Sequence, residues 1–314
     1  MGHSEKLEAI KEQVPSSPRH HVLTAYDYFL YAAVVFAWSF SWWPLKIQAA
    51  SFVADQVSLT WRFLACGILM LLWCLLTKQA MRFSIPNHLR FALLGVLLFS
   101  TNFLLFYLGS DNLPSGLLSV MFSLASVVNS VLVFLLFREK PSPRIVFGGF
   151  LGFAGLGVLF WPEISAQDYS WAVVGSVALC ACGTLSFCCG NIVSASNKKK
   201  DLPLVPMTTY GMFYGAIWCA ILAAVNGKTF TFDTSFEYVA SLSFLVVVSS
   251  LIAFASYLTL LGRIGPARAG YATVMFPVLA LLISTVVEDY RWTLVGFVGL
   301  AMVLAGNVVV LRSR

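Results

Sequence analysis

The stretch Trp38-Ser39-Phe40-Ser41-Trp42-Trp43-Pro44-Leu45-Lys46 lies near the far end of an apolar run that begins at Tyr28. This run is long enough to cross a bilayer as a helix. It carries a proline and a cation near its end, and a second cation, Arg62, enters the next apolar run. A charged side chain at bilayer depth costs about 3 kcal/mol on insertion scales, so it is usually shielded by protein or by a water-filled cavity. The pattern therefore indicates a membrane protein with a polar passage.

The composition supports this class for the whole chain. Of the 314 residues, 59% are hydrophobic and only 11% are charged, whereas a soluble domain has about 25% charged residues. The net charge of +6 does not indicate a nucleic-acid partner, because the basic residues are dispersed at the ends of the apolar runs. We expect no cleaved leader, since acidic residues precede the first run. The seven cysteines lie inside apolar runs without the spacing of a zinc site, which indicates packing roles.

Ten apolar runs have about the 20 residues that a membrane-spanning helix needs. Short joints with proline or polar residues separate the runs, which cover residues 26–46, 57–77, 88–109, 115–137, 144–161, 170–195, 205–225, 237–261, 267–287 and 292–311. Residues 1–25 are predicted to be a polar cytoplasmic tail. With that tail inside the cell, most of the 20 lysines and arginines fall on the cytoplasmic side. We therefore predict that both termini are cytoplasmic.

An internal repeat divides the chain into residues 26–163 and residues 164–314. Gly149-Phe150-Leu151-Gly152 recurs as Gly296-Phe297-Val298-Gly299, and Tyr107-Leu108 recurs as Tyr257-Leu258. Each half holds five predicted spans, and because five is odd the halves must have opposite orientations. Inverted repeats of this kind surround a midplane site in many secondary transporters. We predict an all-α integral membrane fold of ten transmembrane helices, in two inverted five-helix repeats around a central cavity, as one membrane domain.

Candidate ligand-binding residues of the first half lie on shared helix faces. A spacing of three or four residues places side chains on one face of a helix. In the first span this set is Trp38, Ser39, Trp42 and Lys46, and in the third span it is Phe99, Asn102 and Phe106. We expect the rings to hold an apolar or aromatic ligand and Lys46 to meet a carboxylate. Arg62 would face the ligand or Asp55. The alternatives are that the tryptophans pack, that both cations extend to the interface, and that Asn102 bonds to other helices.

The remaining candidates come from the fourth, eighth and ninth spans. Ser123 and Ser126 belong to a hydroxyl stripe that either lines a wet cavity wall or permits close helix packing. Tyr257 and Tyr271 lie on the second-half spans that correspond to spans 3 and 4. No acid or histidine lies in mid-span, and neither a catalytic constellation nor a Walker A loop is present. We therefore predict neither an enzyme nor a bound metal or cofactor.

These features resemble the EamA-type branch of the drug/metabolite transporter superfamily over residues 26–311. The resemblance rests on Trp38-Ser39 with Lys46, on Val57 with Arg62, and on Pro277 with Glu288. The chain departs from the pattern at Asp289, where arginine is common. Within the branch, the tryptophan-rich first span is most similar to bacterial exporters of aromatic amino acids. The resemblance implies a bacterial inner membrane, a cavity lined by spans 1, 3, 4, 6, 8 and 9, and alternating access.

The function predicted from the sequence is export of aromatic or hydrophobic amino acids and related metabolites by a monomeric multi-pass carrier. Its expected partners are the small-molecule substrate and the lipid bilayer, without nucleic acid. One rival is an exchanger of sugar phosphates or nucleotide sugars, whose substrates carry several negative charges and require several cavity cations. A second rival is a non-transporting membrane receptor.

Overall fold

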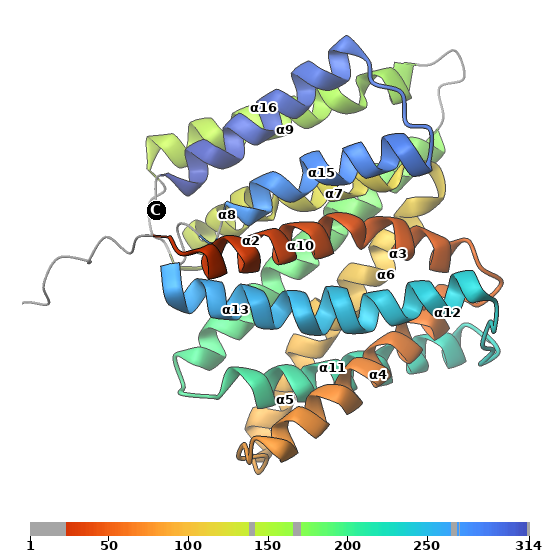
Figure 1. Cartoon of the computed structure of the whole chain (residues 1–314), viewed down its shortest axis with the longest axis vertical. Coiled ribbons are helices and arrows are strands. Elements are labelled where there is room, and N and C mark those ends of the chain that lie inside the picture. The colour runs from red at the N-terminus through yellow and green to blue at the C-terminus, as the bar shows by residue number, and fades with distance from the viewer. Residues whose placement is uncertain (1–22, 138–141, 166–170, 265–268, 270, 313–314) are drawn as a thin grey trace, which may run out of the picture.

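The computed structural model describes residues 23–137, 142–165, 171–264, 269 and 271–312, and the regular structure within these ranges is entirely helical (Figure 1). The polar tail predicted for residues 1–25 lies almost wholly outside them. The helices are, in chain order, α2 (Ala25–Phe40), α3 (Trp42–Ala49), α4 (Asp55–Leu76), α5 (Ile85–Val96), η1 (Leu97–Thr101), α6 (Asn102–Gly109), η2 (Ser110–Asn112), α7 (Ser115–Ser123), α8 (Ala125–Phe137), α9 (Pro143–Ser165), α10 (Trp171–Lys198), α11 (Leu204–Val225), α12 (Phe236–Ser243), η3 (Phe244–Ile252), α13 (Ala253–Ile264), α15 (Ala272–Val287) and α16 (Leu294–Leu311).

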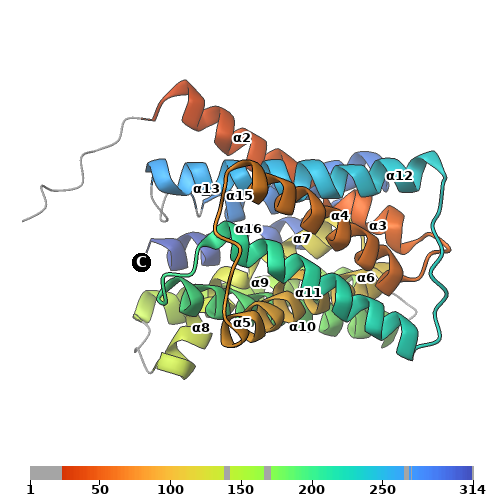
Figure 2. The same ribbon diagram turned by 90° about the horizontal axis from the view of Figure 1, so that it is seen from below.

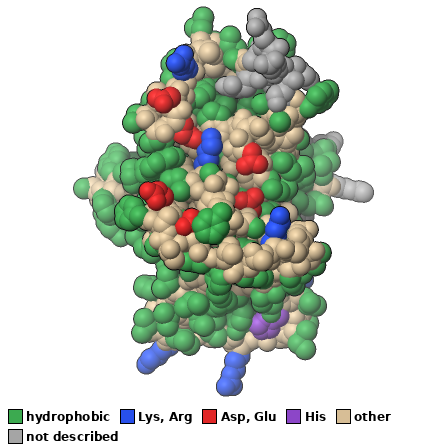
Figure 3. Space-filling model, turned by 90° about the vertical axis from the view of Figure 1, so that its right-hand side faces the viewer, with side chains coloured by type: hydrophobic (Ala, Val, Ile, Leu, Met, Phe, Trp, Pro, Cys, Tyr) green, Lys and Arg blue, Asp and Glu red, His purple; other side chains and the backbone are tan. Residues whose placement is uncertain are grey.

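Eight helical stretches in the described residues are long and apolar enough to cross a membrane. Their outer surfaces carry large hydrophobic side chains, such as Leu76 and Leu294, each 81% exposed. Exposed apolar surface of this extent requires a lipid environment. Figure 3 looks onto one end of the bundle, where acidic side chains gather while hydrophobic side chains cover the flanks. The chain is therefore a multi-pass membrane protein.

Helices lie within each of the ten predicted spans, but the first and ninth are shorter than expected. α2 and α15 have 16 residues each. The first span is divided at Ser41, between α2 and α3. Pro44 has no backbone N–H with which to bond the carbonyl of Phe40, so the helical hydrogen-bond ladder is interrupted there.

Two π-helical segments, η1 and η3, lie within the third and eighth predicted spans. In each, a serine hydroxyl donates to the carbonyl oxygen five residues earlier. Ser100 Oγ lies 3.0 Å from Gly95 O, and Ser250 Oγ lies 2.8 Å from Leu245 O. Widened helical turns of this kind are frequent at functional sites.

Helices from the two halves of the chain pack against each other throughout the bundle. α4 packs on α11, α7 on α15, and α9 on α16, while α2 contacts α13 and α15, and α10 contacts α6 and α8. Figure 2 shows α2 and α13 side by side from a second direction. α2 begins and α16 ends at the same end of the bundle (Figure 1).

Glycine permits the close approach of α9 and α16. A Cβ atom added at Gly299 would lie 2.4 Å from the backbone nitrogen of Leu159, and one at Gly306 would lie 2.5 Å from the carbonyl oxygen of Gly148. Both neighbours are backbone atoms, so a side chain at either position forces the helices apart. The Gly-Phe-x-Gly repeat of the sequence therefore contributes to a helix interface.

Candidate functional site

A cluster of aromatic rings connects helices of the first half of the chain with helices of the second half. The Trp42 ring lies 5.1 Å from Phe106 and 5.6 Å from Phe122, between centroids. Phe122 in turn lies 4.5 Å from Phe187 on α10 and 6.2 Å from Phe276 on α15. Trp42 and Phe106 are buried. The structure thus brings two predicted site residues, Trp42 and Phe106, into one aromatic cluster with three phenylalanines that were not predicted.

Trp38 and Ser39 contact α13 and α15 from the last turn of α2. The Trp38 ring lies 5.1 Å from the ring of Tyr257, and both side chains are half-buried. The buried Ser39 hydroxyl lies 3.0 Å from the carbonyl oxygen of Phe276. Three of the predicted residues therefore connect the first span to the eighth and ninth.

Lys46 forms an ion pair with Glu288, in which Nζ lies 3.0 Å from Oε1. The ammonium also donates to the carbonyl oxygen of Leu113 at 3.0 Å. The second carboxylate oxygen accepts from the backbone N–H of Ser115 at 2.9 Å, from the Ser115 hydroxyl, and from the Ser284 hydroxyl at 2.7 Å. Burial alone raises the pKa of the Glu288 carboxyl, but the hydrogen bonds from Ser115, Ser284 and Lys46 outweigh it, so this pKa lies below its usual range.

Arg62 is 3% exposed, two turns into α4. Its guanidinium carbon lies 4.5 Å from the ring centroid of Phe103 and 5.2 Å from that of Phe63. Arg62 forms neither of the ion pairs found in the described part of the chain, which join Lys46 to Glu288 and Arg263 to Asp27. Its expected alternative partner, Asp55, is therefore not bonded to it in this conformation.

Phe99 and Asn102 lie on the third span, which also carries Phe103, the ring that flanks this cation. Phe99 is in η1, with its ring 5.8 Å from that of Phe63. Asn102 is fully buried; its Oδ1 accepts from the backbone N–H of Phe103 at 2.7 Å, and its Nδ2 has no hydrogen-bond partner in the protein. The predicted face of the third span thus contains one open amide donor.

Ser123, Ser126 and Tyr271 bond to residues of the last span. The Ser126 hydroxyl lies 2.6 Å from Asn307 Oδ1, and Asn307 Nδ2 donates to the Ser123 hydroxyl at 3.2 Å. The Tyr271 hydroxyl lies 3.4 Å from Arg312 Nε. These contacts favour the packing interpretation of the hydroxyl stripe.

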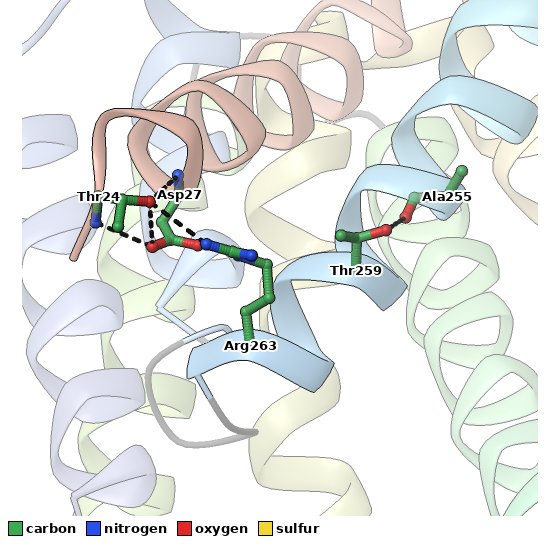
Figure 4. Close-up of polar contacts among 5 residues, drawn as sticks. All are labelled: Thr24, Asp27, Ala255, Thr259 and Arg263. Atoms are coloured by element: carbon green, nitrogen blue, oxygen red, sulfur yellow. Dashed lines mark hydrogen bonds and ion pairs between the residues drawn. The ribbon is translucent and has the colours of Figure 1, made fainter. Parts of the chain in front are cut away.

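A second ion pair closes the opposite end of the first span (Figure 4). Arg263 on α13 donates to the carboxylate of Asp27 on α2. The same carboxylate accepts from the backbone N–H and the hydroxyl of Thr24, at 2.9 and 2.7 Å, and so completes the capping box that begins α2. The first span is therefore held by Asp27 at one end and by Lys46 at the other.

Several of these partners were missed by reasoning from the sequence. Glu288 was recognised only as part of a motif, although its spacing of four from Ser284 places both on one helical face. Gln48 and Asn307 are buried amides whose depth no pattern indicated. No group of three or more metal-ligating side chains occurs among the described residues.

The fold and the site together define a class, a helical multi-pass membrane protein whose halves meet through buried rings and polar pairs. The chain belongs to the EamA-like transporter family, whose model matches residues 26–161 and 174–312. It is 26% identical over 280 residues to the uncharacterized inner membrane transporter YedA of Escherichia coli K12, covering 87% of this chain and 88% of that one.

Two further relatives have the same general description. An uncharacterized transporter of Archaeoglobus fulgidus is 23% identical over 90% of this chain and 99% of its own length. The uncharacterized transporter YvbV of Bacillus subtilis is 25% identical over 88% of each. A solved crystal structure shares the fold with a TM-score of 0.64 and 16% identity, covering 91% of this chain and 98% of that one. The protein is thus a membrane transporter of this family.

Proposed function

We propose that this transporter exports aromatic or hydrophobic amino acids and related metabolites by alternating access. The observation that carries the proposal is the aromatic cluster to which both halves of the chain contribute, with Trp42, Phe106 and Phe276 buried and Phe122 and Phe187 half-buried. Rings provide apolar area and stacking contacts for an aromatic ligand. They touch each other in this conformation, so a ligand enters the predicted central cavity only when the halves separate. The chain itself catalyses no reaction in this proposal.

The proposed architecture is ten membrane spans in two inverted five-helix repeats. It is supported by helix contacts that occur in equivalent pairs, in which each helix of one contact is replaced by the corresponding helix of the other half. The packing of α2 on α13 corresponds to that of α10 on α6, and α2 on α15 corresponds to α10 on α8. The two π-helical segments, each with a serine bonded to the carbonyl five residues earlier, lie in corresponding spans. The family model also matches each half once. Halves that can interchange their contacts are suited to opening on alternate sides.

We further propose that the protein is a monomer of the bacterial inner membrane with both termini cytoplasmic. The end of the bundle at which α2 begins and α16 ends would then face the cytoplasm, in keeping with the distribution of lysine and arginine. The acidic end in Figure 3 would face outward. The first span also resembles that of YddG, a bacterial exporter of aromatic amino acids.

Charge in the bundle favours this substrate over the rival of a sugar phosphate or nucleotide sugar. Lys46 is already paired with Glu288. Arg62 is the one buried cation among the described residues. A single uncompensated positive charge suits one carboxylate, whereas a substrate with two or more negative charges requires several free cations.

Flux into proteoliposomes tests the proposal. Purified protein is expected to carry labelled tryptophan and phenylalanine faster than empty vesicles, with little competition from sugar phosphates. Trp42→Ala should reduce flux strongly. Trp73→Ala, at a side chain 59% exposed on α4, is the matched control and should leave flux unchanged. Folded protein without amino acid flux would contradict the proposal; ligand binding without any flux would favour the receptor.

A further inference from the structure

Arg62 is a buried cation whose hydrogen-bonding capacity is only partly used by the protein. Its side chain is 3% exposed, and Nε and Nη1 have no partner among the protein's acceptors. A buried ion without a partner is strongly destabilised, and an opposite charge with good hydrogen-bond geometry offsets much of that cost. The rings of Phe63 and Phe103 flank the guanidinium and offset part of this cost. They supply no acceptor.

Tyr107, the polar neighbour of Arg62, brings no negative charge to the guanidinium. Tyr107 interacts with Arg62 and donates its hydroxyl proton to Gln48 Oε1 at 2.8 Å. This bond uses the acceptor of the fully buried Gln48 amide and leaves its Nε2 without a partner. Open donors therefore converge around Tyr107 from α3 and α4. A cluster with surplus donors and a positive charge is complementary to an anion.

We propose that Arg62 and Gln48 bind the carboxylate of the transported substrate, with Tyr107 holding the Gln48 amide in position. The inference rests on the proposed function and names the substrate group that the site receives. Lys46, which was expected to meet that carboxylate, is bonded to Glu288 and Leu113. The rings of Phe63 and Phe103 lie beside Arg62, Phe99 packs on Phe63, and these rings would contact the substrate's side chain.

Thermal unfolding of the full chain in nanodiscs tests the inference with defined probes. Tryptophan and indole-3-propionate, which carry a carboxylate, are expected to raise the midpoint temperature. Tryptamine, which lacks the carboxylate, should not. Arg62→Gln should weaken the apparent affinity for both carboxylates by about tenfold or more. Arg82→Gln removes the same charge from an exposed position and should leave the affinity unchanged.

Gln48→Glu provides a second test that does not depend on the folding of the Arg62→Gln variant. It places a carboxylate next to Tyr107 and Arg62, where the substrate's carboxylate is proposed to bind. The variant should therefore have a higher midpoint temperature without ligand and should not respond to indole-3-propionate. Equal protection by tryptamine and tryptophan, or an unchanged carboxylate response in both variants, would overturn the inference. Stabilisation by sodium chloride alone, if it is lost in Arg62→Gln, would also overturn the inference, because an inorganic anion would then occupy the site.

The two proposals fail in distinguishable ways. If wild-type protein transports tryptophan while Arg62→Gln keeps the wild-type affinity, the carboxylate site is wrong and the transport proposal stands. If folded wild-type protein shows neither flux nor stabilisation by any probe, the transport proposal fails as well.

Discussion

Neutralising Glu288 should weaken the junction between α3 and α15 measurably. Its carboxylate accepts three hydrogen bonds from Ser115 and Ser284 and pairs with Lys46 at 3.0 Å. Hydrogen bonds to charged groups contribute about 1.5–3 kcal/mol each when a partner is removed. Glu288→Gln keeps the shape and some of these bonds, so we expect a loss of about 2–4 kcal/mol in the free energy of unfolding.

A double-mutant cycle isolates the share due to Lys46. Because the Lys46 side chain is 32% exposed and that of Glu288 is 12% exposed, solvent screens the pair, and we expect a coupling energy of about 1–2 kcal/mol between Glu288→Gln and Lys46→Met. Unfolding by sodium dodecyl sulfate in mixed micelles, followed by tryptophan fluorescence, measures it. Asp289→Asn, on an exposed neighbour, is the control. A coupling energy below about 0.5 kcal/mol would refute the structural role of the pair.

Three further predictions concern stability. The difference in midpoint temperature between wild type and Glu288→Gln should be constant above about pH 4.3, where a glutamate of the unfolded chain titrates. It should shrink as the pH falls through the lower pKa that Glu288 has in the folded protein. A constant difference down to pH 3 would contradict this. Gly299→Ala should destabilise by about 1–3 kcal/mol, because its Cβ would meet the backbone of Leu159. Gly157→Ala, whose added Cβ would have no neighbour from another element within 4 Å, should be neutral or slightly stabilising in the same unfolding assay. Asn307→Leu should cost about 1–3 kcal/mol by removing its bonds to Ser123 and Ser126; an unchanged midpoint would show that those serines do not depend on it.

Pairings between side chains could be predicted only in part. The shared face of Trp42 and Lys46 follows from helical spacing alone, and the ring contacts of Trp42 confirm that it points inward. The same spacing gave no reason to choose between a ligand and Glu288 as the partner of Lys46. The two residues are distant in the sequence, and only the packing of α3 near α15 brings them within 3.0 Å. The roles in substrate binding remain predictions.

The sequence by itself determined that the chain is helical and membrane-embedded. These properties follow from local composition, because a run of about 20 apolar residues inserts as a helix whatever its neighbours are. The tertiary structure decided which buried polar groups find partners. Ser126 meets Asn307, Asp27 meets Arg263, and Arg62 keeps open donors. Such outcomes depend on contacts between helices far apart in the chain, and no local pattern encodes them.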